Sequence, residues 1–138
     1  MRTDRAFGVI PLMKRDDEWF VFLIQHRKSL HWGLPKGHQE SLESPLDTAF
    51  RELKEETHLV CDRLLQNEPF VEEYVFFSGD EKIHKTVFYF LAEVVGKVEL
   101  QEEEILDGAW FKLSEAIEKM TYPEGKKILS KVLRLWGV

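Results

Sequence analysis

Cysteine is almost absent from this chain: Cys61 is the only one among 138 residues. It cannot form a disulfide within the chain, so we expect a protein held together by packing in a reducing compartment. Apolar runs are short as well, because residues 19–24 and 86–95 fall far below the roughly 20 residues that span a bilayer. The first residues lack the apolar core of a signal peptide. We therefore expect a soluble, cytoplasmic protein with no membrane partner.

Positive charge is also in deficit. Lys and Arg number 19 against 25 Asp and Glu, which gives a net charge of −6. Because proteins that bind nucleic acid through its phosphates usually carry an excess of basic residues, this balance argues against general nucleic-acid binding. The length fits one domain, residues 1–138, with ten Phe, four Trp and three Tyr available for its core. We expect a monomer.

Runs of β-branched and aromatic residues predict five strands. Residues 6–12 and 18–26 flank a polar turn, and residues 69–77 and 84–95 flank the turn residues Ser78-Gly79-Asp80, so we predict two hairpins. A short strand is predicted at residues 108–112. The Gly- and Pro-containing segment 30–38 is typical of an ordered loop.

Capping signals predict the helices. Ser44 is a suitable N-cap, Pro45 fits the first helical position, and Asp47 can complete a capping box, so a helix is expected over residues 45–58. Ser114 is expected to cap a second helix at 115–120, and a last helix is predicted from 123 or 124 to 136. This order of elements indicates an α+β fold in which helices cover a mixed β-sheet.

The helix at 45–58 has two contrasting faces. Its expected core face consists of Leu46, Ala49, Phe50, Leu53 and Thr57. Glu52, Glu55 and Glu56 are expected on the far side, where like charges at this spacing repel one another. Two interpretations follow: a solvated acidic face partly compensated by Arg51 and Lys54, or a site for a hard divalent cation, which selects oxygen ligands.

A longer pattern favours the metal site. Gly37, five residues, Glu43, seven residues and then the run Arg51–Leu59 resemble the Nudix box, except that the box normally has Gly where this chain has His58. The resemblance implies a Nudix-type α/β/α sandwich with a mixed sheet, and a hydrolase that uses Mg²⁺ (or Mn²⁺). Left-handed backbone, which Gly adopts easily, is expected to cost His58 more.

Flanking segments resemble one group of this family, the asymmetric diadenosine tetraphosphate hydrolases. These segments are Trp32–His38, Lys85–Glu93, Glu104 six residues before Trp110, and Trp110–Ala116 followed by Tyr122. The resemblance implies Mg²⁺-dependent hydrolysis of diadenosine tetraphosphate to ATP and AMP, by attack of water on the phosphate chain. The alternatives are pyrophosphate removal from the 5′ end of RNA, hydrolysis of another nucleoside diphosphate derivative, and a non-catalytic nucleotide-binding module.

The resemblance also implies roles for the catalytic and metal-binding residues. Metal ligands would be Glu52, Glu55, Glu56 and Glu104, with help from the Gly37 carbonyl. The general base is open among Glu56, Glu52 and Glu104. Arg51, with Glu43, is expected to form an ion pair that holds the loop and steers the ligand carboxylates.

Substrate contacts are expected from a second set of residues. Lys36, His38 and Lys85 would bind the polyphosphate, and each can also be read as an ordinary surface charge. Tyr89 has two interpretations, a phosphate contact and a plain strand aromatic. Tyr122 likewise is expected either to stack on adenine or to pack in the core. For Arg27, His26 and His31 a solvated role is favoured over a phosphate contact.

Overall fold

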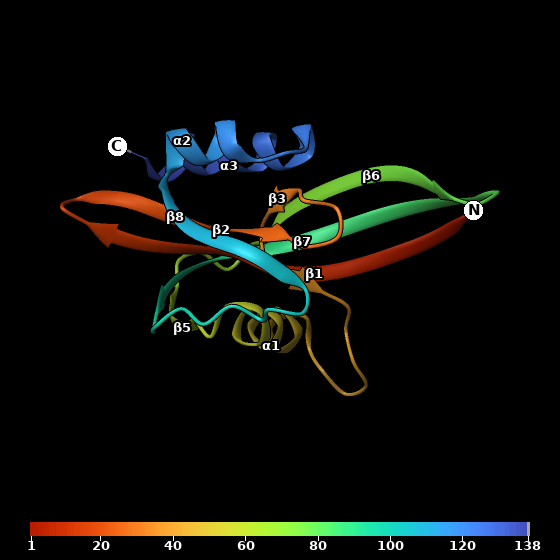
Figure 1. Ribbon diagram of the computed structural model, residues 1–138, viewed down its shortest axis with the longest axis horizontal. Helices are drawn as coiled ribbons and strands as arrows, with labels where there is room; N and C mark the ends of the chain where they lie inside the picture. Colours follow the sequence, from red (N-terminus) through yellow and green to blue (C-terminus); the bar gives the residue numbers. More distant parts are fainter. Residues whose placement is uncertain (138) are drawn as a thin grey trace.

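The computed structural model describes residues 1–137, which form an eight-stranded mixed sheet and three helices (Figure 1). The strands are β1 (Arg2–Arg15), β2 (Glu18–His26), β3 (Trp32–Gly33), β4 (Lys36–Gly37), β5 (Val60–Leu64), β6 (Phe70–Ser78), β7 (Glu81–Val95) and β8 (Ile105–Lys112). The helices are α1 (Pro45–Thr57), α2 (Leu113–Lys119) and α3 (Pro123–Trp136). Within residues 1–137, no helix has the length and apolar character needed to cross a membrane.

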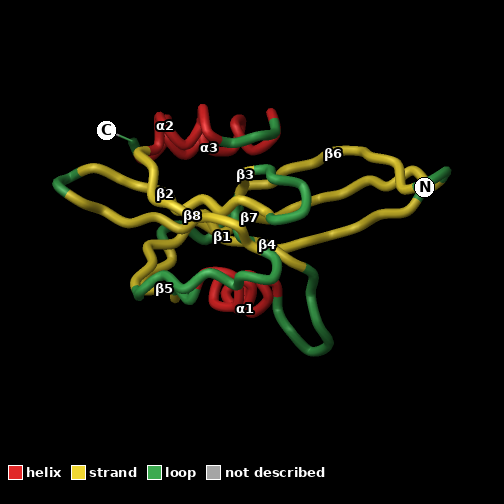
Figure 2. The backbone as a smooth tube through the Cα atoms, viewed as in Figure 1, coloured by secondary structure: helices red, strands yellow, loops and turns green. Residues whose placement is uncertain are grey.

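The sheet is built around β1 and β7, which run parallel from the pair Arg2 and Ile83 to the pair Leu12 and Glu93. Its main path is β3-β2-β1-β7-β5, with β4 paired to β1, β6 to β7 and β8 to β2, all antiparallel. Figure 2 shows α1 on one face of the sheet and α2 with α3 on the other. The predicted α+β fold, an α/β/α sandwich with a mixed sheet, is confirmed.

Each face of the sheet carries its own hydrophobic core. Ala49 and Leu53 of α1 are fully buried with one set of strand residues, and Leu46 and Phe50 pack partly buried beside them. On the other face, Ile128, Leu129 and Val132 of α3 pack against β-strand residues from β1, β2 and β7. The predicted core face of α1 is therefore confirmed, while α3 buries these three residues and leaves Leu135 64% exposed.

The ends of α1 follow the sequence signals. Ser44 and Asp47 form the predicted capping box through reciprocal hydrogen bonds of 3.1 and 3.2 Å. The helix ends at residue 57, one residue earlier than predicted, because His58 adopts a left-handed conformation with φ of 66°. The His58 N–H donates to the Lys54 carbonyl at 2.9 Å, and its Nδ1 lies 3.1 Å from Glu99.

Several predicted boundaries were wrong. Strands β1 and β7 are longer than predicted because pairing with neighbouring strands carries them through mainly polar residues that lack a strand pattern. Strand β8 begins three residues earlier than predicted, at Ile105, which pairs with His26 of β2. Strand β5 was missed, since it is short, carries Asp62 and Arg63 at its centre, and pairs irregularly with β7. Ser114 does not cap α2: the helix begins at the buried Leu113, and the cap position is Lys112, which makes no side-chain capping hydrogen bond.

Candidate functional site

A cavity of about 430 Å³ lies between the acidic face of α1, the β4 loop and the segment before β8, and is called the acidic cavity below. Its lining residues are His26, Lys36, Gly37, His38, Gln39, Glu40, Glu52, Glu55, Glu56, Gln101 and Glu104. The five residues predicted as metal ligands all lie here, together with two of the predicted phosphate-binding residues. The fold therefore brings residues 36–38, 52–56 and 104 to one place.

The position of Glu56 corrects the expectation that it lies on the exposed side of α1. Glu56 is only 4% exposed, because it follows Leu53 by three residues at the border of the apolar face. The Gln101 N–H also closes over it by donating to the Glu56 carbonyl at 3.2 Å. Within residues 1–137 the Glu56 Oε1 atom has no hydrogen-bond partner. Burial, reinforced by the charge of Glu52, raises the pKa of Glu56 to about 8.

Glu52 lies against the backbone of Gly37. A Cβ atom at Gly37 would be only 2.1 Å from the Glu52 carboxyl carbon, so any other residue here would displace this carboxylate. Burial raises the pKa of Glu52, and the neighbouring Glu55 and Glu104 charges act in the same direction, while hydrogen bonds from Arg51 oppose them. The cavity thus concentrates negative charge.

Arg51 offsets part of this charge. Its Nε atom donates to Glu43 at 2.6 Å, which is the predicted ion pair. Its Nη1 atom donates to Glu52 at 2.9 Å and to Glu55 at 3.1 Å. Its Nη2 atom donates to the His38 carbonyl at 3.0 Å, so one guanidinium joins α1 to the β4 loop. The hydrogen bonds from Arg51 lower the pKa of Glu43 to about 2.

The chemistry of the acidic cavity fits a hard divalent cation. Within residues 1–137, no three Asp, Glu, His or Cys side chains are already arranged to hold a metal ion, and Arg51 engages two of the carboxylates. The available donors are nevertheless carboxylate oxygens, and the buried Oε1 of Glu56 lacks a partner. Because Mg²⁺ keeps waters and takes phosphate oxygens as further ligands, an incomplete set of carboxylates is sufficient.

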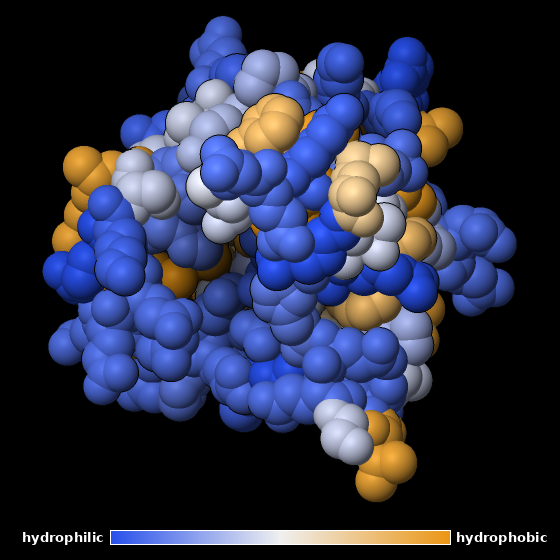
Figure 3. Space-filling model, turned by 90° about the vertical axis from the view of Figure 1, so that its right-hand side faces the viewer, coloured by the Kyte–Doolittle hydropathy of each residue, from blue (hydrophilic) through white to orange (hydrophobic). Residues whose placement is uncertain are grey.

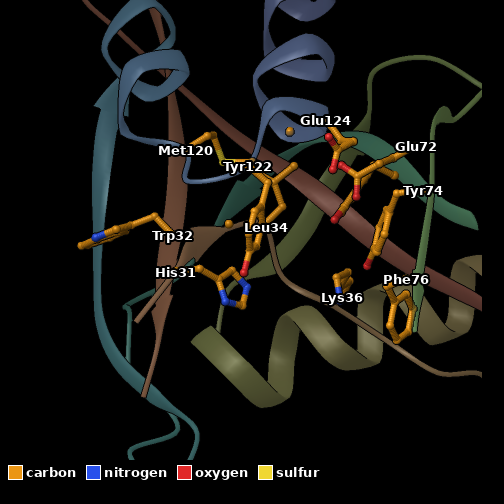
Figure 4. Close-up of a pocket in the computed structure, with 13 residues that line it drawn as sticks. His31, Trp32, Leu34, Lys36, Glu72, Tyr74, Phe76, Met120, Tyr122 and Glu124 are labelled. Atoms are coloured by element: carbon orange, nitrogen blue, oxygen red, sulfur yellow. The ribbon is translucent and has the colours of Figure 1, made fainter. Parts of the chain in front are cut away.

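A second cavity of about 430 Å³ lies between β6, the start of α3 and the segment 31–36, and is called the aromatic pocket below. Its lining residues are His31, Trp32, Gly33, Leu34, Lys36, Glu72, Tyr74, Phe76, Tyr89, Met120, Tyr122, Glu124 and Gly125. Figure 4 shows Tyr74 and Tyr122 on either side of this pocket. The end of the molecule viewed in Figure 3 is mostly hydrophilic, with a hollow in which hydrophobic residues are visible.

The two tyrosines predicted to contact substrate line the aromatic pocket in different ways. Tyr122 is 51% exposed, and its ring lies 5.1 Å from that of His31, so it is not a core residue. Tyr89 is only 3% exposed and belongs to the core, yet it also forms part of the pocket wall. Tyr89 is therefore a core aromatic of its strand, as one interpretation held, and its phosphate contact stays a prediction.

The predicted cationic residues are not equivalent. Lys36 lines both cavities, and burial lowers its pKa, as does the charge of Lys85. His38 Nε2 lies 3.1 Å from the Asp4 carboxylate at the edge of the acidic cavity. Lys85 is nearly buried, lies 3.4 Å from Asp4 and lines neither cavity. Lys36 is thus the cation that links the two cavities.

His26 and His31 correct the expectation of a solvated role. Their rings stack with centroids 4.1 Å apart, and within residues 1–137 the buried Nε2 of His26 has no hydrogen-bond partner. Burial lowers the pKa of His26 to about 4 and lowers that of His31, so both rings are neutral near pH 7. His26 lines the acidic cavity and His31 the aromatic pocket.

Sequence reasoning missed the residues of the aromatic pocket that come from β6 and the start of α3. Glu72, Tyr74 and Phe76 alternate along β6, so period-two spacing predicts that they share a face. Nothing in the sequence shows that this face lies opposite Glu124, because that contact depends on how α3 crosses the sheet.

Comparison with known families agrees with this geometry. The NUDIX domain model matches residues 2–132. The chain belongs to the Nudix family. This Nudix protein is a hydrolase, and members of the family generally use divalent metal ions.

The relatives of this chain are not all named for the same activity. A rat protein named as an asymmetrical bis(5′-nucleosyl)-tetraphosphatase is 37% identical over 125 residues, covering 89% of this chain and 84% of the relative. A Lactococcus lactis protein named "Probable DHNTP pyrophosphohydrolase" is 36% identical over 129 residues, covering 86% of this chain and 71% of the relative. The solved structure of a Caenorhabditis elegans Ap4A hydrolase binary complex has the same fold, with a TM-score of 0.76 and 22% identity over 97% of this chain and 98% of that one.

Proposed function

We propose that this Nudix hydrolase cleaves diadenosine tetraphosphate asymmetrically into ATP and AMP, with Mg²⁺ (or Mn²⁺) in the acidic cavity. The proposal treats the protein as a cytoplasmic monomer that does not bind nucleic acid in general. The name carried by the rat relative supports the substrate, and the structural observation behind the proposal is that Lys36 lines both cavities.

The connection through Lys36 matters because a dinucleoside polyphosphate has a base at the end of a charged chain. A base between Tyr74 and Tyr122 would place its phosphates toward Lys36 and then toward Glu56. Stacking on an aromatic ring contributes about 1–3 kcal/mol per base. The protein is acidic overall, so local cations such as Lys36 and His38 have to attract the polyphosphate.

In this proposal the residues of the acidic cavity hold the cation and the attacking water. Glu52, Glu55, Glu56 and Glu104 are the ligands, with the Gly37 carbonyl. The bound cation supplies Lewis acidity and neutralises charge on the phosphate chain. One of Glu52, Glu56 and Glu104 takes the proton of the water that attacks phosphorus.

Arg51 acts on the ligand carboxylates in this proposal. Its hydrogen bonds to Glu43 and to the His38 carbonyl would hold the guanidinium in place, and its hydrogen bonds to Glu52 and Glu55 would orient two of the carboxylates that hold the cation.

Chromatography of the products tests the proposal. The protein is incubated with Mg²⁺ and, in parallel, with diadenosine tetraphosphate, diadenosine triphosphate, dATP and a 5′-triphosphorylated RNA. We expect equal amounts of ATP and AMP from the first substrate and none when a chelator is present. Two ADP would contradict the cleavage position, turnover of the RNA alone would favour a 5′-end pyrophosphohydrolase, and no turnover of any substrate would favour a binding module.

A further inference from the structure

The aromatic pocket contains two carboxylates for which hydrolysis of the phosphate chain has no use. Glu72 comes from β6 and Glu124 from the first turn of α3, so they are far apart in sequence. Both side chains line the pocket, and Figure 4 shows them directed into it close to one another, with His31 at the opposite end. They therefore line the same pocket as the Tyr74 and Tyr122 rings, within reach of a base that stacks there.

Neither carboxylate has a partner among the described residues. The hydrogen bonds and ion pairs formed within residues 1–137 involve neither the Glu72 nor the Glu124 side chain, although both are half-buried. Burial raises the pKa of Glu72, the Lys36 charge opposes this shift and the Glu124 charge adds to it. Both carboxylates therefore face the open pocket, where a bound molecule with paired donors can replace water as their hydrogen-bond partner.

Tyr89 independently indicates that the pocket takes a polar ligand. Tyr89 is only 3% exposed, and it lines the same pocket. Among residues 1–137 its hydroxyl forms no hydrogen bond. Within residues 1–137 the buried polar atoms that lack a partner belong to His26 and Glu56, so the Tyr89 hydroxyl is open to the pocket and not sealed in the core. It is therefore free to bond to a molecule in the pocket, as the two carboxylates are.

The chemistry of these groups selects among the bases. An ionised carboxylate only accepts hydrogen bonds. Guanine presents its ring N1–H and its exocyclic amino group side by side, whereas adenine presents an amino group beside the ring N1, which is itself an acceptor. Cytosine and uracil have smaller rings and no pair of adjacent donors. A pair of carboxylates at the edge of a stacking site therefore matches guanine best.

We propose that Glu72 and Glu124 make the aromatic pocket selective for guanine, so that guanine-containing dinucleoside polyphosphates bind better than their adenine counterparts. The effect on hydrolysis rests on the proposed function, whereas the effect on binding requires only the pocket.

Competing substrates test the proposal on the intact enzyme. We expect kcat/KM for diguanosine tetraphosphate to exceed that for diadenosine tetraphosphate by about tenfold, with most of the difference in KM, since a bidentate contact to a base discriminates by this order. Glu72→Gln and Glu124→Gln should each reduce this ratio to within about threefold of unity, because an amide presents one donor and one acceptor in the same shape. Glu73→Gln is the matched control: Glu73 is the next residue of β6, is exposed and lines neither cavity, so the ratio should not change.

Calorimetric binding of GTP and ATP in the presence of a chelator separates this proposal from the proposed function. We expect GTP to bind about tenfold more tightly than ATP, and the difference to disappear in the Gln variants. That result without any hydrolysis would support the base selectivity and contradict the proposed reaction. Hydrolysis with equal kcat/KM for the two dinucleotides, or a preference for adenine, would overturn the base selectivity and leave the reaction standing.

Discussion

The acidic cavity and the aromatic pocket have the same volume and share Lys36, yet they are built on opposite principles. The acidic cavity takes most of its ligand candidates from a single helical turn, and buries one of them, Glu56, without a partner. The aromatic pocket combines side chains from four separated parts of the chain, and its Tyr122 is half exposed. The acidic cavity brings repelling carboxylates together, whereas the aromatic pocket exposes apolar ring surface that can stack with a ligand.

This difference suggests separate tasks: the acidic cavity for the reaction and the aromatic pocket for substrate binding. The carboxylates of the acidic cavity repel one another and Arg51 offsets only part of their charge, so they suit a cation, and changes there should act on turnover. Aromatic faces gain from stacking whether or not the reaction proceeds, so changes there should act mainly on substrate binding. Each experiment below tests one side of this contrast.

The largest effect is expected in the acidic cavity. Glu56→Gln removes the charge of the buried carboxylate but keeps its shape, so kcat for diadenosine tetraphosphate should fall by about a thousandfold or more. Circular dichroism should show an unchanged fold. Glu103→Gln, an exposed glutamate next to Glu104, is the control and should keep normal turnover. A Glu56→Gln enzyme within tenfold of the wild-type rate would contradict the proposed role.

A smaller effect, on KM, is expected in the aromatic pocket. Tyr122→Ala removes one stacking surface, so kcat/KM should fall about ten- to a hundredfold, chiefly through KM. Tyr122→Phe keeps the ring and should restore most of the affinity. Steady-state kinetics with diadenosine tetraphosphate distinguish the two variants. A lower kcat with unchanged KM in Tyr122→Ala would mean that the pocket takes part in the chemistry, against the contrast drawn above.

The pH dependence of the unfolding free energy should show the cost of ionising the buried Glu56 carboxyl. The folded-state pKa of Glu56, about 8, lies above the ordinary value of 4.5, so folding favours its protonated form and stability falls as pH rises toward 8. Between pH 6.5 and 8 the metal-free protein should lose about 1–2 kcal/mol through this group. Urea unfolding should show a smaller loss in Glu56→Gln, and an equal loss in both proteins would exclude Glu56 as its source.

The smallest effect lies at the end of α1, outside both cavities. His58 holds a left-handed backbone with φ of 66°, which Gly adopts without strain. His58→Gly should therefore stabilise the protein by about 0.5–1 kcal/mol, reduced by the loss of the exposed contact with Glu99. Turnover should not change. Chemical denaturation measures the gain, and a destabilised variant would mean that the His58 side chain contributes more than its backbone costs.

The same contrast explains how far the sequence could predict the site. Glu52, Glu55 and Glu56 are neighbours on one helix, so local periodicity brings them together, and the capping signals at Ser44 and Asp47 fix where that helix begins. The spacing to Gly37 extends this pattern to the β4 loop. Local periodicity therefore predicted the helical part of the acidic cavity, while Gly37 and Glu104 followed only from the resemblance to the Nudix family.

The aromatic pocket was not predictable in this way. Glu72 and Glu124 meet only because β6 pairs with β7 and α3 crosses the same face of the sheet, which no local pattern specifies. Burial was also difficult to predict: Glu56 was expected on the exposed side, although the segment before β8 covers it. Helical periodicity gives the direction of a side chain, but it does not show which distant segment packs over it.

A crystal structure with Mn²⁺ and a diadenosine tetraphosphate analogue whose phosphate bridges are methylene groups would test most directly whether the two cavities form one site. The account predicts an anomalous scattering peak beside Glu56, one adenine between Tyr74 and Tyr122, and phosphates passing Lys36. A metal peak away from Glu56, or a base outside the aromatic pocket, would contradict it.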